Sequence, residues 1–560
     1  MNPTRLQVLA AVLAAAVIVL LGVGAVTGVL VSPLPADGPV AESDDEPATT
    51  GERPDEPSTT ETVGYVEGYW YDDELAVDDR DDAALDDEEL EAVVYRSMAR
   101  VEQLRNLTFD EEVPVDVVSR EQFEAEDDGV VGNASATERL SRSVTYETLF
   151  MVDRETPLEA ELEELYGGTV EGYYDPSTDE VVVVSDNPES PELDEVVLGH
   201  ELLHALQDQH FDLASYQRET IDQDAAKNGL IEGDAVWIDT EYEKRCLEAW
   251  DCVQPEGETV APPTINYGLY LIVFQPYSDG PGYVEYHLED GDWEAVDDLY
   301  DDPPVSSAEV IRPGDDREPA DLSVADRSSD EWERFGSDDG GETVGEVGMV
   351  SMFAAGTMDH SRPAVIDSEA FFTDDVGYDY DQPPTDGWAG DELVVYAHAD
   401  LDPDGDLAAG DVSDARDQTA YVWASTWETD ADARQFLEAY EQLLEGYDAD
   451  PVDDWQATYV IDDEFPGAYA IDRDGETVTI VRAPSVDDLA AVDGGVFADS
   501  DTDSALEGPA TTANEDAGRE AAADSIDGFG FGSASVAIVT GVGTAIVVVR
   551  TRNRRQGRGP

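Results

Sequence analysis

Eleven residues, HELLHALQDQH at 200–210, constrain the fold of this chain more than any other segment. The chain has six histidines, and three of them lie in this stretch. His200 and His204 are four residues apart, so on an α-helix they share one face and can bind one metal ion. Glu201 lies about 100° around such a helix and can reach a water molecule beside the ion. We therefore expect a helix with His200 and His204 as metal ligands and Glu201 as general base.

The residues around this motif argue against a surface helix with incidental histidines. The segment VVLGHELLHAL is apolar on both sides of His200, as expected for a helix that is buried around an active site.

A third protein ligand has to come from elsewhere. Asp208 is eight residues beyond His200, and two helical turns rise about 12 Å, which is too far to share the ion. We expect Asp208 to hydrogen-bond a ligand or to pack the end of the helix. His210 stands at the third histidine of the pattern H-E-x-x-H-x-x-G-x-x-H, but Gln207 replaces its glycine. The helix should then continue and carry His210 away, which makes Glu232, in GLIEGDAVWIDTEYEK, the preferred ligand and His210 the alternative.

The charge balance limits the kind of partner. Among 560 residues, 132 are acidic and 29 are basic, for a net charge of −103. A hydrophobic content of 41% and an aromatic content of 8% are too high for a disordered acidic chain. We expect a folded protein whose acidic surface is suited to high salt. Nucleic-acid binding is not expected, because it needs a basic surface.

Both ends of the chain predict membrane segments. Residues 6–31 are apolar and long enough to cross about 30 Å of hydrocarbon. A second apolar run, 529–549, precedes an arginine-rich tail, which indicates a cytoplasmic C-terminus. The first run is either an anchor or a cleaved signal peptide, with an anchor preferred. These patterns predict a cell-membrane protein with both termini cytoplasmic and most of the chain extracellular.

The two cysteines of the chain suit an oxidising compartment. Cys246 and Cys252 are six residues apart. In such a compartment this close spacing favours a disulfide over a pair of metal ligands.

Several segments taken in order carry a resemblance to a known family. HELLHALQDQHFDL is followed about twenty residues later by GLIEGDA. Upstream lies VEGYYDPSTDEVVVV, and downstream lie DWEAVDDLYDDPPVSSAEV, GWAGDELVVY and STWETDADARQF. Together they resemble a gluzincin-like family of zinc metallopeptidases, secreted and membrane-anchored proteins of bacterial and haloarchaeal surfaces, over roughly residues 85–490.

The resemblance implies one zinc ion per chain and a set of roles. His200, His204 and Glu232 would be its ligands, and Glu201 the catalytic base. The family pattern has an aspartate four residues after the glutamate ligand, whereas this chain has Val236 there. Asp239 or Asp234 then becomes the candidate for orienting a histidine.

The expected fold class is α+β. A zincin-like metallopeptidase domain, with a mixed sheet whose edge strand lies over the HExxH helix and with a second ligand helix, precedes a C-terminal α+β region, and two transmembrane helices flank them. The strand Val181–Val184 is either that edge strand or a strand buried inside the sheet. We expect helices at 87–107, 191–209 and 222–245, and strands at 113–119 and on both sides of the turn at 175–179.

This fold class divides the chain into seven regions. They are an N-terminal transmembrane anchor or signal peptide (1–31), an acidic Pro/Thr-rich linker (32–62), the zincin-like catalytic domain (63–260), a loop-rich extension (261–385), an α+β C-terminal region (386–490), an acidic linker (497–527) and a C-terminal transmembrane helix with a basic tail (528–560).

A weaker pattern concerns calcium. DPDGDLAAGD places Asp402, Asp404 and Asp406 as in a calcium loop, but Leu407 and Ser413 stand where that loop has a glycine and an acid. Ca²⁺ is therefore only a secondary expectation beside Zn²⁺.

The function expected from these patterns is hydrolysis of a protein or peptide substrate by a membrane-anchored, extracellular zinc peptidase. Two alternatives stay open at this point. One is a non-catalytic surface protein with a structural zinc site, although a structural site has no use for Glu201. The other is a zinc hydrolase of a non-peptide amide or ester, because the same activated water attacks those bonds.

Overall fold

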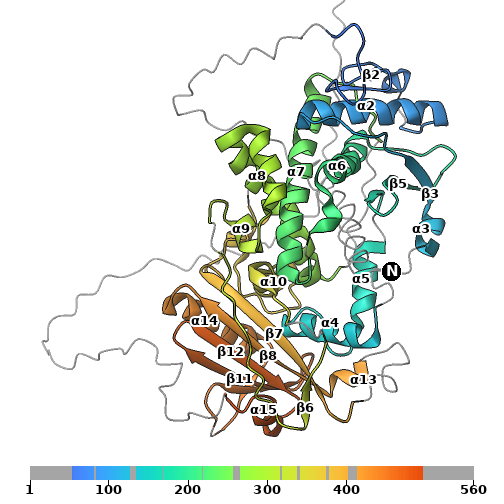
Figure 1. Cartoon of the computed structure of the whole chain (residues 1–560). Helices are drawn as coiled ribbons and strands as arrows, with labels where there is room; N and C mark the ends of the chain where they lie inside the picture. The colour runs from blue at the N-terminus through green and yellow to red at the C-terminus, as the bar shows by residue number, and fades with distance from the viewer. Residues whose placement is uncertain are drawn as a thin grey trace, which may run out of the picture.

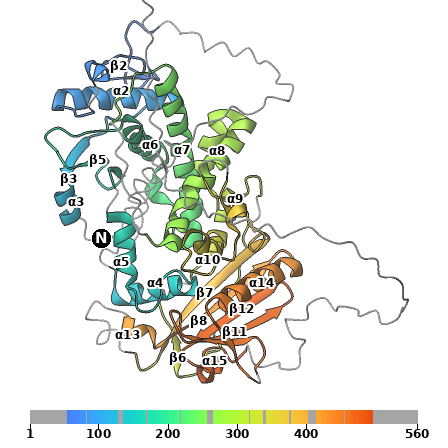
Figure 2. The ribbon, with the colours of Figure 1, turned by 180° about the vertical axis from the view of Figure 1, so that it is seen from behind.

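The computed structural model describes residues 53–80, 83–126, 134–167, 170–216, 218–255, 265–315, 318–336, 341–373, 377–401, 413–453 and 455–495. Helices and a small sheet form one half of the molecule, and a large sheet forms the other (Figure 1). Figure 2 shows the same two halves from behind. The apolar helix α10 (Gly345–Met358) lies between them and packs on elements of both.

The first half contains the elements from the N-terminus to α9. They are β1 (Tyr65–Val66), β2 (Tyr69–Trp70), η1 (Ala76–Asp79), α2 (Asp87–Arg105), β3 (Val115–Ser119), α3 (Arg120–Glu126), α4 (Ala136–Thr148), α5 (Leu158–Gly167), β4 (Gly172–Asp175), β5 (Glu180–Ser185), α6 (Glu195–Phe211), η2 (Leu213–Ser215), α7 (Ile221–Glu248), α8 (Tyr267–Asp301) and α9 (Ser307–Ile311).

The helices α6, α7 and α8 form the packed centre of this half. The core beside α6 contains Leu198, Leu202 and Leu206, all essentially inaccessible to solvent. Helix α7 packs against α8 and also contacts α6. As a result, α6 is covered on several sides and its polar side chains point into the protein.

The second half is a seven-stranded antiparallel sheet in the order β6-β7-β8-β12-β11-β10-β9. Its elements are β6 (Trp332–Arg334), α11 (Ser368–Phe371), β7 (Trp388–His398), α13 (Ser413–Arg416), β8 (Thr419–Trp427), α14 (Asp430–Gly446), β9 (Asp450–Pro451), β10 (Thr458–Ile461), β11 (Gly467–Asp474), β12 (Thr477–Ala483) and α15 (Val486–Val492).

Successive side chains along the strands of this sheet point to opposite faces and form two separate hydrophobic cores, one on each face. On β7, Leu393 and Val395 belong to the core shared with α14 and α10. Val394 and Tyr396 point to the opposite face, which α15 covers. This period of two is what a sheet covered by apolar groups on both faces requires.

The region predicted as loop-rich, 261–385, contains two long helices. They are α8, which spans 35 residues, and α10. Pro276 and Pro281 lie inside α8, and the backbone leaves helical geometry at Gly291 and Asp292, so the sequence shows no regular helical period there. Helix α10 is buried on all sides, which removes the polar face by which a helix is recognised.

The predicted fold class is wrong as it was stated. Within the part of the chain that the structure describes, no helix is long and apolar enough to cross a membrane. The two flanking transmembrane helices, and with them the predicted membrane anchoring and cell-membrane location, are not found in this part of the chain. Residues 6–31 and 529–549, on which those predictions rested, lie outside the described residues, as does the possible calcium loop at Asp402–Asp406.

The architecture itself also differs from a zincin-like domain followed by a C-terminal region. It is a mixed α/β chain in which the large sheet is antiparallel and the sheet beside α6 has only three strands, in the order β3-β5-β4. In that small sheet Val181–Val184 is not an edge strand. It belongs to β5, which pairs in parallel with β3 and antiparallel with β4. The edge strand beside α6 is β4.

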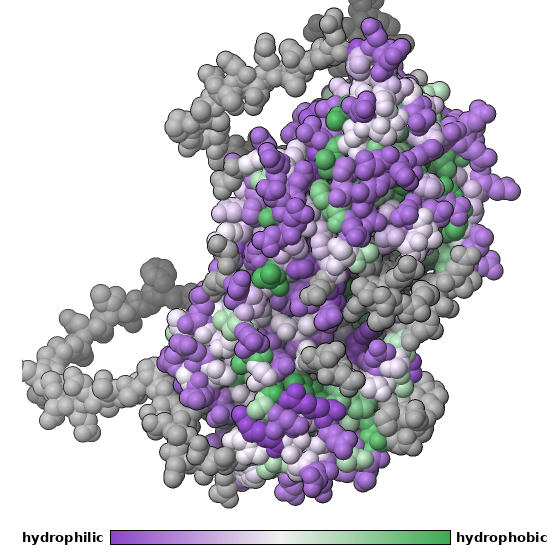
Figure 3. Space-filling model, viewed as in Figure 1, coloured by the Kyte–Doolittle hydropathy of each residue, from purple (hydrophilic) through white to green (hydrophobic). Residues whose placement is uncertain are grey.

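The surface reflects the charge balance of the sequence. Hydrophilic side chains cover most of the face seen in Figure 3. Among the described residues, only five large hydrophobic side chains are clearly exposed: Leu247, Tyr286, Val305, Phe372 and Trp455. Leu247 lies on α7 and Tyr286 on α8, and the other three lie outside the helices and strands.

Candidate metal centre

The two helices that carry the predicted ligands are each capped by a side chain. At the start of α6, Asp194 accepts a hydrogen bond from the backbone N–H of Val196. At the start of α7, Thr220 accepts one from Gln223. Such caps satisfy N–H groups that have no partner inside a helix. The motif therefore lies on a well-defined helix from its first turn.

The structure brings His200, His204 and Glu232 together in the interior. Their ligand atoms all lie within 4.8 Å of one another, and each of the three residues is buried. Oε2 of Glu232 is 3.4 Å from Nε2 of His200 and 3.4 Å from Nε2 of His204. Two imidazole nitrogens and one carboxylate oxygen thus converge from α6 and α7 on a single point.

The hydrogen bonds around this point fit a bound cation. The two Nε2 atoms are 3.1 Å apart, and Oε2 of Glu232 has no hydrogen-bond partner within the described part of the chain. Two imidazole nitrogens and a carboxylate oxygen this close together in a buried place need a positive charge among them, which a bound metal ion or a proton on a histidine supplies. Two histidines and one glutamate are also a ligand set that zinc takes in hydrolytic sites.

The pKa shifts of the three groups also indicate that this place favours positive charge. Burial would lower the pKa of His200, but Asp239 and Glu232 outweigh it and raise that pKa well above its ordinary value. For His204, burial alone would lower the pKa, but the neighbouring Glu232 outweighs burial and the pKa is raised. Burial would raise the pKa of Glu232, but the two histidines lower it to about 2.

Asp239 orients His200. Its Oδ2 lies 2.7 Å from Nδ1 of His200, and it comes from α7, two turns beyond Glu232. Val236, which replaces the aspartate of the family pattern, only packs against the hydrophobic core. A carboxylate one turn further along the helix therefore occupies the place that the pattern assigns to that aspartate.

Glu201 lies beside the converging ligands with one oxygen held and one free. Its Oε2 accepts a hydrogen bond of 3.0 Å from the backbone N–H of Tyr174 on β4. Its Oε1 is buried and has no hydrogen-bond partner among the described residues. Burial raises the pKa of Glu201, and the two histidines oppose this only in part. The free oxygen is thus a buried proton acceptor beside the candidate metal site.

Tyr277 is a site residue that the sequence did not reveal. It is buried on α8, and its hydroxyl has no hydrogen-bond partner in the described part of the chain. Burial, followed by the charge of Glu232 and the closeness of its carboxylate to the hydroxyl, raises the pKa of Tyr277 well above the ordinary value. The hydroxyl therefore remains protonated and available as a donor beside the ligand cluster.

A glycine contact places Tyr277 there. A Cβ atom on Gly233 would lie 2.4 Å from the carbonyl carbon of Gly280, so α7 and α8 touch backbone to backbone. Gly233 follows Glu232, and Gly280 is three residues beyond Tyr277. The spacing Gly229-x-x-x-Gly233 in α7 was the sequence signal that could have indicated this close crossing.

The remaining predicted site residues lie outside the ligand cluster. Asp208 accepts from the hydroxyl of Tyr174 at 2.9 Å and from the N–H of Leu213 at 2.9 Å, so it closes the end of α6. His210 is exposed and lies 2.8 Å from the carbonyl oxygen of Thr108 through its Nε2.

Asp234 is fully buried and pairs with Arg105. It therefore lies behind the site and does not belong to the ligand cluster.

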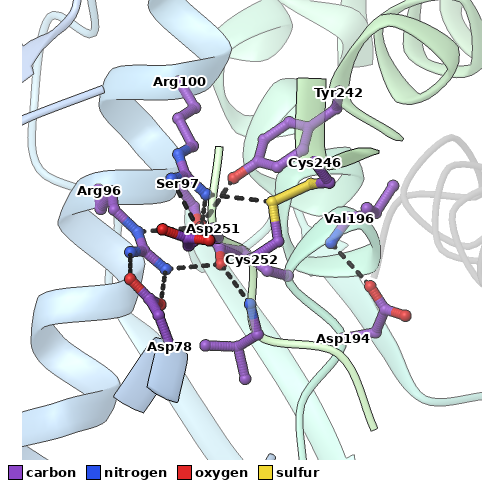
Figure 4. Close-up of a disulfide and its surroundings, with 12 residues drawn as sticks. Asp78, Arg96, Ser97, Arg100, Asp194, Val196, Tyr242, Cys246, Asp251 and Cys252 are labelled. Carbon is purple, nitrogen blue, oxygen red and sulfur yellow. Dashed lines mark hydrogen bonds and ion pairs between the residues drawn. A yellow bond between two sulfur atoms is a disulfide. The ribbon is translucent and has the colours of Figure 1, made fainter. Parts of the chain in front are cut away.

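A disulfide and a buried ion-pair network secure the first turn of α6. Cys246, near the end of α7, is bonded to Cys252 (Figure 4). The next residue along the chain, Val253, donates its N–H to Glu195 at 2.9 Å. Glu195 also pairs with Arg100 at 2.7 Å and with Arg96 at 2.8 Å, both from α2. Glu195 is five residues before His200, so these contacts fix the helix close to the ligands.

Comparison with known proteins adds one match. Residues 333–493 are similar to a family described as a domain of unknown function (DUF8575). The match covers the seven-stranded sheet with α14 and α15, and it does not include the ligand cluster. No curated protein and no solved structure matches the chain.

Proposed function

We propose that this protein is a zinc-dependent peptidase. The observation that carries the proposal is the arrangement of four buried side chains: three converge on a cation site, and the fourth, Glu201, lies beside them with one oxygen that has no hydrogen-bond partner among the described residues. The resemblance of the motif and its neighbours to a zinc metallopeptidase family supports the same reading.

His200, His204 and Glu232 would hold the zinc ion. When bound there, zinc would act as a Lewis acid and lower the pKa of a bound water to about 7. The chain's own contribution is to orient this site, since Asp239 fixes the ring of His200 and the α6–α7 packing fixes the distance to Glu232.

Glu201 would act as the general base. Its Oε1 is free to take a proton from the attacking water and to pass it to the leaving amine. The bond from Tyr174 to Oε2 prevents the carboxylate from turning away. The raised pKa of Glu201 lies closer to neutral pH than that of a free glutamate, and a general base is most effective when its pKa is near the working pH.

Tyr277 would stabilise the negative charge that develops on the carbonyl oxygen of the substrate. Its hydroxyl is a protonated donor beside Glu232, fixed by the tight crossing of α7 and α8. A donor held in place before the reaction loses nothing to reorganisation when the charge forms.

Strand β4 would align the substrate. It is the edge of the three-stranded sheet, and the N–H of Tyr174 points away from β5 toward Glu201. Gly172, two residues earlier, faces the same helix, because a Cβ on it would lie 3.7 Å from Cγ of Glu201. An extended peptide added to this edge would run past the general base.

The alternative of a purely structural metal site is less well supported. Such a site needs ligands but gives no reason to bury Glu201 with an oxygen unpaired, which costs about 1–3 kcal/mol.

The experiment is hydrolysis of a peptide library and casein by the full-length chain in molar salt, as wild type, Glu201→Gln and His210→Ala. We expect cleavage by wild type and by His210→Ala, and a loss of at least about 100-fold in Glu201→Gln with zinc still bound. Equal cleavage by wild type and Glu201→Gln would overturn the proposal.

A further inference from the structure

His204 has an orienting partner of an unusual kind. Its Nδ1 lies 2.9 Å from Oε1 of Gln207, three residues further along the same helix. Both side chains are almost completely buried, at 2% and 1% exposure. His200, in contrast, is oriented by the carboxylate of Asp239 from another helix. A neutral amide and a charged carboxylate thus hold the two histidines.

The surroundings of Gln207 determine which way its amide points. Its Nε2 lies 3.0 Å from the carbonyl oxygen of Ile231, 3.3 Å from Oδ2 of Asp234 and 2.9 Å from the hydroxyl of Tyr300. The first two can only accept. The Tyr300 hydroxyl donates to Asp234 at 2.8 Å and so is also an acceptor toward Gln207. All three atoms act as acceptors toward Gln207, so the NH₂ group of the amide, and not its carbonyl oxygen, faces them and shares its two hydrogens among them.

The proton of His204 follows from this orientation. Because the NH₂ group faces Ile231, Asp234 and Tyr300, the carbonyl oxygen of Gln207 faces His204. A carbonyl oxygen accepts and cannot donate, so Nδ1 of His204 carries the hydrogen. In the neutral ring, Nε2 is then the bare nitrogen, and Nε2 is the atom that points at His200 and Glu232.

We propose that Gln207 is the positioning residue of His204 and that it acts by keeping the ring proton on Nδ1. This inference rests on the proposed function only in taking His204 as a metal ligand. Gln207 stands where the pattern H-E-x-x-H-x-x-G-x-x-H has a glycine. In this chain the helix continues through that position, and the side chain of Gln207 hydrogen-bonds His204.

The ion pairs behind Gln207 explain why an amide, and not a carboxylate, contacts His204. Asp234 is fully buried and pairs with Arg105 of α2 at 3.0 Å. Arg105 in turn pairs with Asp297 of α8 at 2.7 Å. The charge of Asp234 is therefore balanced from behind, and Gln207 separates it from His204. His204 is held in place without a second carboxylate that would make it more basic.

The test compares two glutamines of one helix. Gln207→Met keeps the length of the side chain and removes its hydrogen bonds. Gln209→Met makes the same change two residues away, where the side chain binds Asp110 and Glu111 at the surface. The full-length chain is titrated with Zn²⁺ against a chelator and with Co²⁺ for its absorption spectrum. Unfolding of the metal-free variants is measured beside them.

We expect Gln207→Met to weaken zinc binding about 10- to 100-fold and to change the Co²⁺ spectrum. Gln209→Met should stay within about twofold of wild type. A merely structural role of Gln207 would lower the stability of the metal-free chain and leave the Co²⁺ spectrum unchanged. That result, or equal zinc affinity in Gln207→Met and wild type, would overturn the inference and leave the proposed function standing.

A second variant covers the case in which Gln207→Met does not fold. Tyr300→Phe keeps the ring and removes only the hydroxyl that holds the amide of Gln207. We expect zinc binding about fivefold weaker, the value of one neutral hydrogen bond. Unchanged affinity in Tyr300→Phe would overturn the inference. Absence of zinc binding by the wild type would overturn it together with the proposed function.

Discussion

At the scale of single residues, the hydroxyl of Tyr277 makes the sharpest prediction about catalysis. If it donates to the substrate oxygen, Tyr277→Phe should lower kcat by about 100-fold or more. Zinc content should not change, since Tyr277 is not a ligand. Steady-state kinetics with metal analysis on the same preparation checks both values.

Tyr283 provides the matched control, because it is buried on the same helix and lies outside the ligand cluster. Tyr283→Phe should leave kcat within about twofold of wild type. A loss of activity in both variants would mean that a general change in α8, and not the hydroxyl of Tyr277, is responsible.

A second residue-scale prediction concerns pH and stability. Asp222, in the first turn of α7, is 2% exposed and accepts from the N–H and the hydroxyl of Ser307. Burial raises its pKa to about 7 from the ordinary 3.8. Between these values the folded chain keeps a proton that the unfolded chain has lost. Stability therefore falls as pH rises from about 4 to 7 and levels off above.

Asp222→Asn keeps an acceptor for Ser307 and removes the charge. Compared with wild type, this variant should gain a few kcal/mol of unfolding free energy between pH 5 and pH 8. Urea denaturation at the two pH values measures the difference. Glu219→Gln, at an exposed position just before the helix, should follow the wild type. Parallel pH profiles for Asp222→Asn and wild type would contradict the assignment.

At the scale of elements, the crossing of α7 and α8 controls the site. A Cβ at Gly233 would meet the backbone of Gly280 at 2.4 Å, so neither helix can give way by a side-chain rotation. Gly233→Ala should lower the unfolding free energy by about 1–3 kcal/mol or more. It should also reduce activity, because the crossing places Tyr277 beside Glu232.

Gly282, two residues beyond Gly280 on α8, has open space where a Cβ would be added. Gly282→Ala should be neutral or stabilise the chain by up to about 1 kcal/mol through helix propensity. Guanidinium denaturation in molar salt compares the two variants. Similar stabilities would show that the crossing tolerates a side chain at Gly233.

The elements also show what the sequence could predict. Helices α6 and α7 and the hairpin of β11 and β12 follow from local pattern, capping residues and turn residues. Helix α8 does not, because prolines and glycines interrupt its period, and α10 does not, because every side of it is buried. Whether Val181–Val184 is central or at an edge depends on pairing with β3, which no local pattern contains.

The same distinction holds for the site. His200, Glu201 and His204 are readable because helical spacing alone brings them together. Glu232 could be named from the resemblance and from its place on the next helix. Tyr277 could not, because it reaches the site through a helix crossing. The role of Gln207 was also hidden, since it depends on Asp234 and Tyr300 from two other helices.

At the scale of the whole molecule, net charge should dominate stability. A chain with a charge of −103 repels itself, and salt reduces the range of this repulsion from about 10 Å at 0.1 M to about 3 Å at 1 M. We expect the Tm to rise by an amount on the order of 10 °C between these concentrations. Equal gains in KCl and tetramethylammonium chloride would identify screening as the cause. A Tm that does not depend on salt would contradict it.

The measurement that tests the central claim most directly is zinc content per full-length chain in three variants. The account predicts about one zinc per chain in wild type and in His210→Ala, and none retained by Glu232→Ala after dialysis against a weak chelator. Glu232→Ala is the informative variant, because Glu232 is the ligand that the motif itself does not contain. Zinc retained by Glu232→Ala and lost from His210→Ala would contradict the account.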